Sequence, residues 1–445
     1  MLIGAGNDPA PSSVKGTPVR RCLIVSPHFP PSTVAGVHRA RHLVKALPAH
    51  GWDPCVIAVD PAYHVEALDH ALRALVPAGA RVIETGAIPA RWTTPLGLRG
   101  EIGLRGYFHL RAAIAREIAA RRPEVVMITG SPFYPMLLAG WITRRFGVPA
   151  VLDFQDPWAS NEGAGRRRWS KGWWAHRLAV MLEPQALRGA AWVTAVSERQ
   201  CAELAGRYPW LDRSRISAVP IGGDPDDAAS LRIATLSDAD PAEPGRKRIF
   251  SYVGTAMPRS APLLTILFGA LAKLRAQAPE LAGQIRLRFV GTSNQPGQSR
   301  DYRVMPLAEA AGVADLVSEQ PGRVPFAEAL RILAGTDAVL LVGSDEPHYT
   351  ASKIYPGLMS GRPFLSIFHA ESSAHQILLS AGGGAALAYH GEDHRAALIA
   401  AVSAELAKLA TDPAAFGQAN PAAYAAFTAD SVAGAFARIF AAAAA

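Results

Sequence analysis

The sequence predicts an α/β protein made of two Rossmann-like domains that face each other across a cleft. Its 445 residues leave room for two or three domains, each with its own core. Short runs of branched apolar residues alternate with longer segments whose apolar positions recur every three or four residues, which is typical of βαβ units. A stretch rich in Gly, Pro and Asp interrupts this alternation at residues 222–248, which we interpret as an interdomain linker.

The first domain is expected over residues 19–221, after a polar tail at residues 1–18. Its first strand is predicted at 21–26, and a helix follows at 37–50 with one apolar face and Gly51 as its stop signal. Further near-continuous apolar runs, typical of parallel strands buried on both faces, lie at 55–59, 81–84, 125–129, 151–154, 192–195 and 216–219.

The second domain is expected over residues 249–425, with a terminal helix at 426–445. The Ala-rich end of the chain, from about Ser431, predicts that helix because alanine has the strongest helix propensity. Six strands are predicted before it, at 249–254, 285–290, 316–319, 338–342, 364–367 and 385–388.

Composition excludes several classes of protein. Apolar residues make up 49% and charged residues 18% of the chain, so it should fold rather than stay disordered. Cys22, Cys55 and Cys201 are too scattered for a disulfide framework or a CxxC metal site, which favours a reducing cytosol. The N-terminus does not resemble a signal peptide, and no stretch resembles a membrane span.

The charge of +8 is unevenly distributed. Residues 1–222 carry 27 Lys and Arg against 16 Asp and Glu, whereas residues 223–445 carry 18 against 21. The first half therefore has a net charge of +11 and the second half of −3. This difference indicates an anionic partner such as a lipid surface, a phosphorylated substrate or a nucleic acid.

Ligands of open α/β sheets bind at the carboxyl ends of strands, so candidate residues are sought there. Gly36 precedes the first long helix, where free backbone N–H groups could hold a phosphate, although an ordinary strand-to-helix connection fits equally well. No GxGxxG motif in a strand-to-helix context and no Walker motif occurs, which disfavours a dinucleotide oxidoreductase. Asp153 and Asp156 could bind sugar hydroxyls or act as acid and base, or Asp156 could cap a turn.

A basic, aromatic segment at 165–177 contains Arg166, Arg167, Arg168, Trp169, Trp173 and Trp174. Tryptophan favours the headgroup region of a bilayer and arginine favours anionic lipid, so this segment could dock on a membrane. The same composition could bind RNA, but no recognisable nucleic-acid-binding module accompanies it. A solvated loop leading into a core helix from Leu178 is the remaining interpretation.

Two segments of the second half could bind phosphate. Gly254 and Thr255 end a strand, and the Arg259 guanidinium lies close enough along the chain to clamp a diphosphate. If Ser352 caps a helix that starts at Lys353, the backbone amides and the lysine ammonium converge on one point. Each segment could also be an ordinary loop or helix cap.

Together these segments resemble the GT-B glycosyltransferases, in particular the retaining family-four enzymes of bacterial surface-polysaccharide assembly. The resemblance covers nearly the whole chain and rests on SPHFPPSTVAGVHRARHLVKALPAHGW, DFQDPW, VTAVSE, YVGT and SKIYPGLMSGRPFLSI, in that order. It implies a terminal helix that returns to the first domain, a nucleotide-diphosphate sugar bound mainly by the second domain, and an acceptor bound by the first. It also implies transfer without an obligatory metal or other cofactor.

The resemblance assigns roles to residues of this chain. Arg259 and Lys353 would neutralise the diphosphate leaving group, assisted by Ser352, while the Gly36 loop would approach the donor from the first domain. Gly254, Thr255 and Tyr355 complete the expected donor site, and Asp153 and Asp156 are the acid and base candidates.

Departures from the family pattern leave alternatives open. In many relatives the tyrosine that corresponds to Tyr355 is followed by a glutamate that grips the donor ribose, and a second glutamate lies eight positions earlier. This chain has Pro356 and His348 at those positions. Relatives often also carry a histidine near the reacting sugar, where this chain reads Thr129, Gly130 and Ser131. A weakened GT-B protein that serves as a binding partner in a polysaccharide assembly complex, or a nucleotide-sugar epimerase or hydrolase on the same fold, would explain these losses.

We expect a cytoplasmic glycosyltransferase that acts on a glycan or a polyprenyl-diphosphate-linked acceptor at the inner face of the plasma membrane. The positive first half fits such an acceptor at an anionic bilayer.

Overall fold

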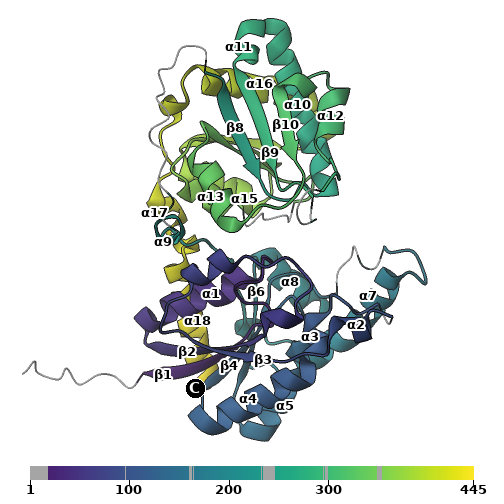
Figure 1. Ribbon diagram of the computed structural model, residues 1–445, viewed down its shortest axis with the longest axis vertical. Helices are drawn as coiled ribbons and strands as arrows, with labels where there is room; N and C mark the ends of the chain where they lie inside the picture. Colours follow the sequence, from purple (N-terminus) through teal and green to yellow (C-terminus); the bar gives the residue numbers. More distant parts are fainter. Residues whose placement is uncertain are drawn as a thin grey trace, which may run out of the picture.

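The computed structural model shows two lobes stacked along the long axis of the molecule, each a parallel sheet covered by helices (Figure 1). The described residues are 19–95, 97–159, 163, 165–231, 233, 246–293, 295, 299–347 and 353–445. The two predicted Rossmann-like units are therefore present.

The first lobe contains a seven-stranded sheet with the order β3-β2-β1-β4-β5-β6-β7. Every neighbouring pair is parallel, and the sheet is buried because helices cover both of its faces. All seven strands predicted from apolar runs are confirmed, within three residues at either end: β1 (Arg20–Val25), β2 (Trp52–Val59), β3 (Arg81–Thr85), β4 (Val125–Gly130), β5 (Ala150–Phe154), β6 (Trp192–Ala195) and β7 (Ile216–Ala218).

The second lobe contains a six-stranded parallel sheet with the order β10-β9-β8-β11-β12-β13. Its six predicted strands are also confirmed: β8 (Arg248–Val253), β9 (Ile285–Val290), β10 (Val317–Gln320), β11 (Ala338–Val342), β12 (Phe364–His369) and β13 (Gly384–Tyr389). In both sheets the strand order reverses beside the first strand, and such a switch point opens a crevice at the carboxyl ends of the strands.

Helices connect most of the strands. Those of the first lobe are α1 (Val37–Ala46), α2 (Ala90–Thr93), α3 (Ile102–Arg105), α4 (Tyr107–Arg121), α5 (Ala139–Phe146), α7 (Lys171–Leu187) and α8 (Glu198–Arg207). The rest of the chain contributes α9 (Asp227–Ser230), α10 (Ala261–Gln277), α11 (Pro279–Gly283), α12 (Met305–Ala310), α13 (Phe326–Ala334), α14 (Ile354–Met359), α15 (Ser373–Ala381), α16 (Arg395–Thr411), α17 (Pro421–Tyr424) and α18 (Ala429–Ala444).

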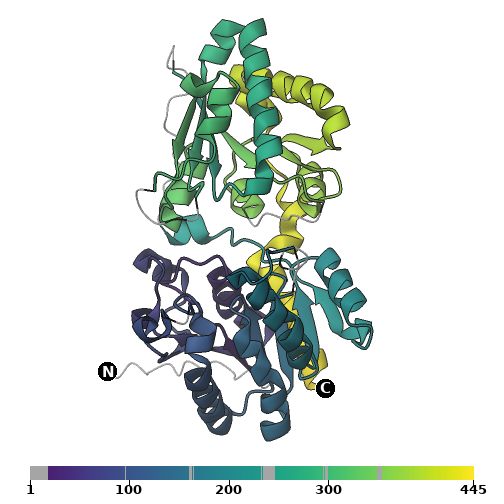
Figure 2. The same ribbon diagram turned by 90° about the vertical axis from the view of Figure 1, so that its right-hand side faces the viewer.

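The terminal helix α18 returns to the first lobe, as expected. Figure 2 shows it leaving the second lobe and running down against the first. Its apolar face joins the same core cluster as α1 and β2, and the Phe440 ring meets the Trp52 ring edge-on at 5.4 Å between centroids. The core of the first lobe is therefore completed by the last residues of the chain.

The two segments that cross between the lobes are bonded to each other. Gly223 N donates to Phe427 O at 2.9 Å, and Ala429 N donates to Gly223 O at 2.8 Å. Residues 222–248, assigned to a linker from composition, contain α9 and the start of β8, while residues 232 and 234–245 lie outside the described part.

Candidate functional site

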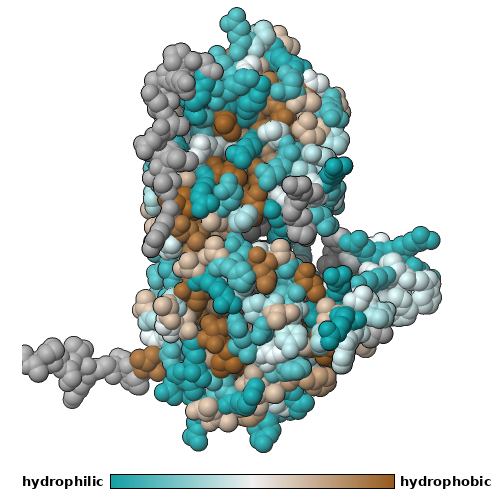
Figure 3. Space-filling view, in the orientation of Figure 1, coloured by the Kyte–Doolittle hydropathy of each residue, from teal (hydrophilic) through white to brown (hydrophobic). Residues whose placement is uncertain are grey.

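A cavity of about 760 Å³ lies between the two lobes. Its walls are formed by loops that follow strands β1, β2 and β7 of the first sheet and β8, β9 and β10 of the second. Figure 3 shows the molecular surface hollowed between the lobes. The carboxyl ends of both sheets thus face one shared space, which is where ligands bind in folds of this kind.

Lys353 is the cationic residue of the second lobe that best fits an anionic ligand. It lines the cavity at the N-terminal end of α14, and its Nζ lies 4.1 Å from the centroid of the Tyr252 ring. The Nζ donates to the Tyr252 hydroxyl and, at 3.4 Å, to Thr255 O. No described carboxylate forms an ion pair with it, and burial lowers the pKa of Lys353 to about 7.

Gly254 and Thr255 lie beside Lys353 in the cavity wall. Gly254 has a φ of +137°, and a Cβ placed there would come within 3.4 Å of the Lys353 Cδ. That distance is an ordinary van der Waals contact, so it is the positive φ, which L side chains rarely adopt, that favours glycine here.

Arg259 does not line the cavity in this structure. Its Nε lies 2.8 Å from Asp345 Oδ1 and 3.3 Å from Glu346 Oε1, and 59% of the side chain is exposed. A diphosphate would have to compete with these two carboxylates, so the predicted clamp is not formed here.

Tyr355 is placed away from the cavity. It is 2% exposed, belongs to a core cluster of the second lobe and stacks on Phe427 at 5.6 Å. Packing, rather than donor contact, is the role that these surroundings give it. Ser352 and His348 lie outside the described residues, whereas Pro356 lines the cavity.

Asp153 holds a buried network together. It is fully buried, and its carboxylate accepts from Arg39 Nε at 3.1 Å, Thr129 Oγ1 at 2.7 Å and Thr194 Oγ1 at 2.8 Å. The Arg39 guanidinium also donates to the carbonyls of residues 219 and 220. The geometry corrects the acid or base prediction for Asp153, because its oxygens face protein donors and water cannot reach them.

Asp156 follows β5, and Gly36 directly precedes α1. The Asp156 side chain is exposed to solvent and does not line the cavity. Desolvation by the surrounding protein nevertheless raises the pKa of its carboxyl. Gly36 begins α1 in helical conformation, and its carbonyl accepts from Gln155 Nε2 at 3.3 Å. Gln155 therefore ties the Gly36 loop to the end of β5.

Sequence reasoning missed contacts that join the lobes across the cavity. The Asp69 carboxylate accepts from the backbone N of Phe326 at 3.1 Å, and the Phe326 ring lies 4.8 Å from the ring of His38. Arg41 joins α1 to the linker, because it donates to both oxygens of Asp227 in α9, at 2.7 and 2.5 Å. No local sequence signal indicates these pairs, because the partners are 186 to 288 residues apart along the chain.

The segment at 165–177 forms the start of a projecting helix. α7 begins at Lys171, where Ser170 Oγ accepts from Trp173 N, so the helix starts seven residues before the position expected at Leu178. Leu178 is 36% exposed, which corrects the expectation of a core helix from that residue. Figure 1 shows α7 extending sideways from the first lobe.

The three tryptophans gather on this arm. Their ring centroids lie 4.6 to 5.5 Å apart, and Trp169 and Trp174 are 67% and 53% exposed. Arg166, Arg167 and Arg168 are exposed beside them. Exposed aromatic rings next to cations form a surface suited to a partner rather than to water alone.

Comparisons with known proteins agree with this architecture. Residues 35–222 match the family model described as a glycosyl transferase 4-like domain. A D-inositol 3-phosphate glycosyltransferase of Gordonia bronchialis is 27% identical over 221 residues, which cover 48% of this chain and 45% of that protein. A protein of the same name from Geodermatophilus obscurus is 26% identical over 218 residues, 47% of this chain and 45% of its own. The matched part thus spans less than half the length of these relatives.

Solved structures share the fold over nearly the whole chain. Anabaena HepE, solved with UDP and glucose, superposes with a TM-score of 0.56 at 15% identity, covering 94% of this chain and 98% of HepE. WaaG, a glycosyltransferase involved in lipopolysaccharide biosynthesis, gives 0.53 at 16% identity, with 94% and 95% covered. A UDP-forming trehalose-phosphate synthase from Burkholderia xenovorans gives 0.60 at 12% identity, with 95% and 98% covered. The two facing Rossmann-like units therefore form the GT-B fold.

Proposed function

We propose, from the glycosyl transferase 4-like domain at residues 35–222 and the GT-B fold of the whole chain, that this protein is a glycosyltransferase. It moves a sugar from a nucleoside-diphosphate sugar to a glycan or lipid-linked acceptor in bacterial polysaccharide assembly. The donor diphosphate binds the second-lobe wall of the cavity, and the acceptor enters from the first lobe. The resemblance implies retention of configuration at the transferred sugar.

The position of Lys353 in the cavity wall is the observation that carries this proposal. A lysine that faces a cavity without a carboxylate partner among the described residues pays a desolvation cost, which a bound anion would offset. The diphosphate gains negative charge as the sugar leaves, so a fixed ammonium at that point stabilises the transition state. HepE, which shares the fold, is solved with UDP, UDP-glucose, and UDP and glucose.

Calorimetric titration with UDP, GDP, ADP, dTDP and their sugar conjugates tests the donor site. One nucleotide should bind selectively, and Lys353→Ala should weaken that binding while the exposed-lysine variant Lys247→Ala binds like the unmodified protein. Failure of every nucleotide to bind a well-folded sample would refute the proposal.

A second candidate function rests on Pro356. This apolar ring lines the cavity at the position where resembling enzymes have a ribose-binding glutamate. A GT-B protein that has lost transfer and acts as a binding partner in an assembly complex would keep the fold without that contact. Such a protein would show no nucleotide-dependent chemistry, and an epimerase would interconvert two donor sugars without any acceptor.

The arm formed by α7 is proposed to dock on anionic lipid. The exposed tryptophans favour the headgroup region of a bilayer, and the neighbouring arginines are attracted to anionic lipid headgroups. No helix among the described residues has both the length and the apolar character needed to span a bilayer, so the proposed contact is peripheral.

Vesicle flotation tests this contact. Replacing Trp169, Trp173 and Trp174 with Ser should release the protein from phosphatidylglycerol-containing vesicles, and vesicles of phosphatidylcholine alone should bind it weakly. The matched control replaces Trp210, a 46% exposed tryptophan elsewhere on the first lobe, and should keep vesicle binding. Unchanged binding of the triple variant would refute the docking role.

A further inference from the structure

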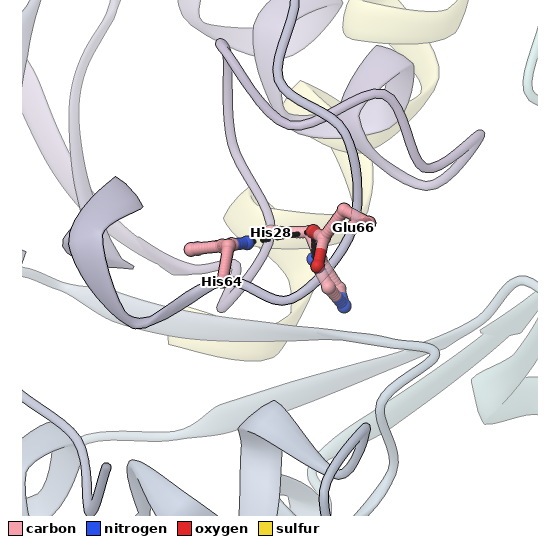
Figure 4. Close-up of side chains that lie close together, drawn as sticks. All are labelled: His28, His64 and Glu66. Carbon is pink, nitrogen blue, oxygen red and sulfur yellow. Dashed lines mark hydrogen bonds and ion pairs between the residues drawn. The ribbon is translucent and has the colours of Figure 1, made fainter. Parts of the chain in front are cut away.

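Two histidines and a glutamate converge in the first lobe, beside the cavity. His28 lies in the loop after β1, and His64 and Glu66 follow β2 and the short 3-10 helix η2 (Pro61–Tyr63). Figure 4 shows the two rings on either side of the Glu66 carboxylate. Glu66 lines the cavity, whereas only 1% of the His64 side chain is exposed.

The donor atoms of the three residues point to one place. Nδ1 of His28 lies 2.9 Å and Nδ1 of His64 lies 2.6 Å from the same oxygen, Oε1 of Glu66. All three ligand atoms lie within 4.8 Å of one another. The hydroxyl of Ser32 adds a fourth donor atom, 2.6 Å from Oε1 and 3.3 Å from Nδ1 of His28.

A hydrogen bond to the backbone fixes the orientation of the His64 ring. Its Nε2 lies 3.1 Å from the carbonyl oxygen of Val59, to which it donates. With Nε2 held by this carbonyl, Nδ1 points at the Glu66 carboxylate, so a ring nitrogen and a carboxylate oxygen face one point where a cation could bind. A backbone carbonyl behind the ring is also the usual arrangement for histidines that bind metal.

We propose that His28, His64 and Glu66 bind one divalent transition-metal ion, with Ser32 or water as a further ligand. Two imidazoles and a carboxylate suit Zn²⁺, and also Co²⁺ or Ni²⁺, better than Mg²⁺ or Ca²⁺, which prefer oxygen ligands alone. Ligands about 2.0–2.2 Å from one ion lie about 3 Å or more apart, so the side chains would separate slightly on binding. His28 and Glu66 lie on loops and are 12% and 19% exposed, which leaves room for that movement.

The sequence did not predict this metal site. The ligands come from two loops whose histidines are 36 residues apart, without the spacing of a metal-binding motif. The site belongs to the first-lobe wall, while Lys353 belongs to the second-lobe wall, so the inference does not depend on the proposed donor site.

Metal binding by the full-length, chelator-treated protein tests the inference without any activity assay. Titration with Co²⁺ should give visible ligand-field absorption that saturates at one ion per chain, and Zn²⁺ should displace it. His28→Ala and Glu66→Gln should each weaken Co²⁺ binding by at least about tenfold, since even outer-shell changes cost that much. His70→Ala removes an exposed histidine four residues after Glu66 in the sequence and should bind Co²⁺ like the unmodified protein.

His28→Ala should disturb folding least, because His28 is the more exposed of the two histidines. This variant therefore still tests the site if Glu66→Gln unfolds. Absence of saturable Co²⁺ absorption in the folded, unmodified protein would overturn the site and leave an ion-free hydrogen-bond network. Wild-type affinity in both ligand variants would overturn it equally, by placing the ion elsewhere.

Discussion

Nucleoside-diphosphate binding at Lys353 is expected to take up a proton at pH 8. Burial lowers the pKa of the free lysine to about 7, so most molecules carry a neutral amine at that pH. A bound diphosphate favours the ammonium and returns the pKa toward its ordinary value. The perturbation that removes this coupling is Lys353→Met, which keeps the length of the side chain and deletes the titrating group.

The size of the effect follows from the two pKa values. With a pKa of about 7 in the free protein and an ordinary value in the complex, binding at pH 8 takes up about 0.9 proton, and binding at pH 6 about 0.1. The sign is fixed because the free state binds fewer protons than the complex. The dissociation constant should therefore rise with pH, by about 50-fold between pH 7 and pH 9.

Isothermal titration with UDP in buffers of different ionisation enthalpy measures the proton directly. At pH 8 the observed heat should vary linearly with buffer enthalpy, with a slope near the predicted uptake, and the slope should vanish in any residual binding by Lys353→Met. Lys247→Met, which removes an exposed lysine, is the control and should keep the full slope. Buffer-independent heats from an unmodified protein that binds UDP would refute the reasoning.

Three further predictions concern stability and are measured by urea unfolding. Asp153→Ala should cost about 3–5 kcal/mol because it leaves the buried guanidinium of Arg39 without its carboxylate, and unchanged stability would contradict the structural role. Phe436→Ala should cost about 3–5 kcal/mol because that fully buried ring joins α18 to the first-lobe core; a much smaller loss would mean that the helix does not complete this core. Gly383 and Gly361 both have positive φ, +73° and +70°, so alanine should cost about 1 kcal/mol or more at either. Gly383→Ala should cost more, since its Cβ would lie 2.1 Å from a backbone nitrogen; equal losses would show that the clash is relieved.

The fold was accessible from the sequence because its signals are local. A parallel strand buried on both faces must be a short apolar run, and β6, β9 and β11 begin and end at the predicted residues. The helix predicted at 37–50 is α1 followed by the 3-10 helix η1 (Leu47–His50), and Gly51 ends this segment with a φ of +79°, as its position predicts. Lys353 was proposed as a phosphate-binding residue from its place at an expected helix start, and it lines the cavity.

The candidate site was less predictable because its electrostatics depend on distant partners. Asp153 lies 114 residues from Arg39, so the sequence shows a carboxylate at a strand end but not the guanidinium that occupies it. Arg259 was expected to be free for a ligand, whereas Asp345 and Glu346 of a loop after β11 hold it. Pairings across such separations are decided by the tertiary fold and leave no local pattern.

The start of α7 is marked in the sequence by a capping residue. A solvated loop leading into a core helix from Leu178 was one interpretation left open for the Trp- and Arg-rich segment. Ser170 precedes the helix instead, and its hydroxyl accepts from the backbone N of Trp173.

The return of α18 to the first lobe has a consequence for biosynthesis. A chain leaves the ribosome from its N-terminus, so the strands of the first lobe emerge long before the 16 residues of α18 that finish its core. Until α18 has been synthesised, the apolar surface around Trp52 and Leu47 lacks its final cover. A truncated or stalled product would keep that surface exposed, which offers chaperones and proteases a way to recognise incomplete chains.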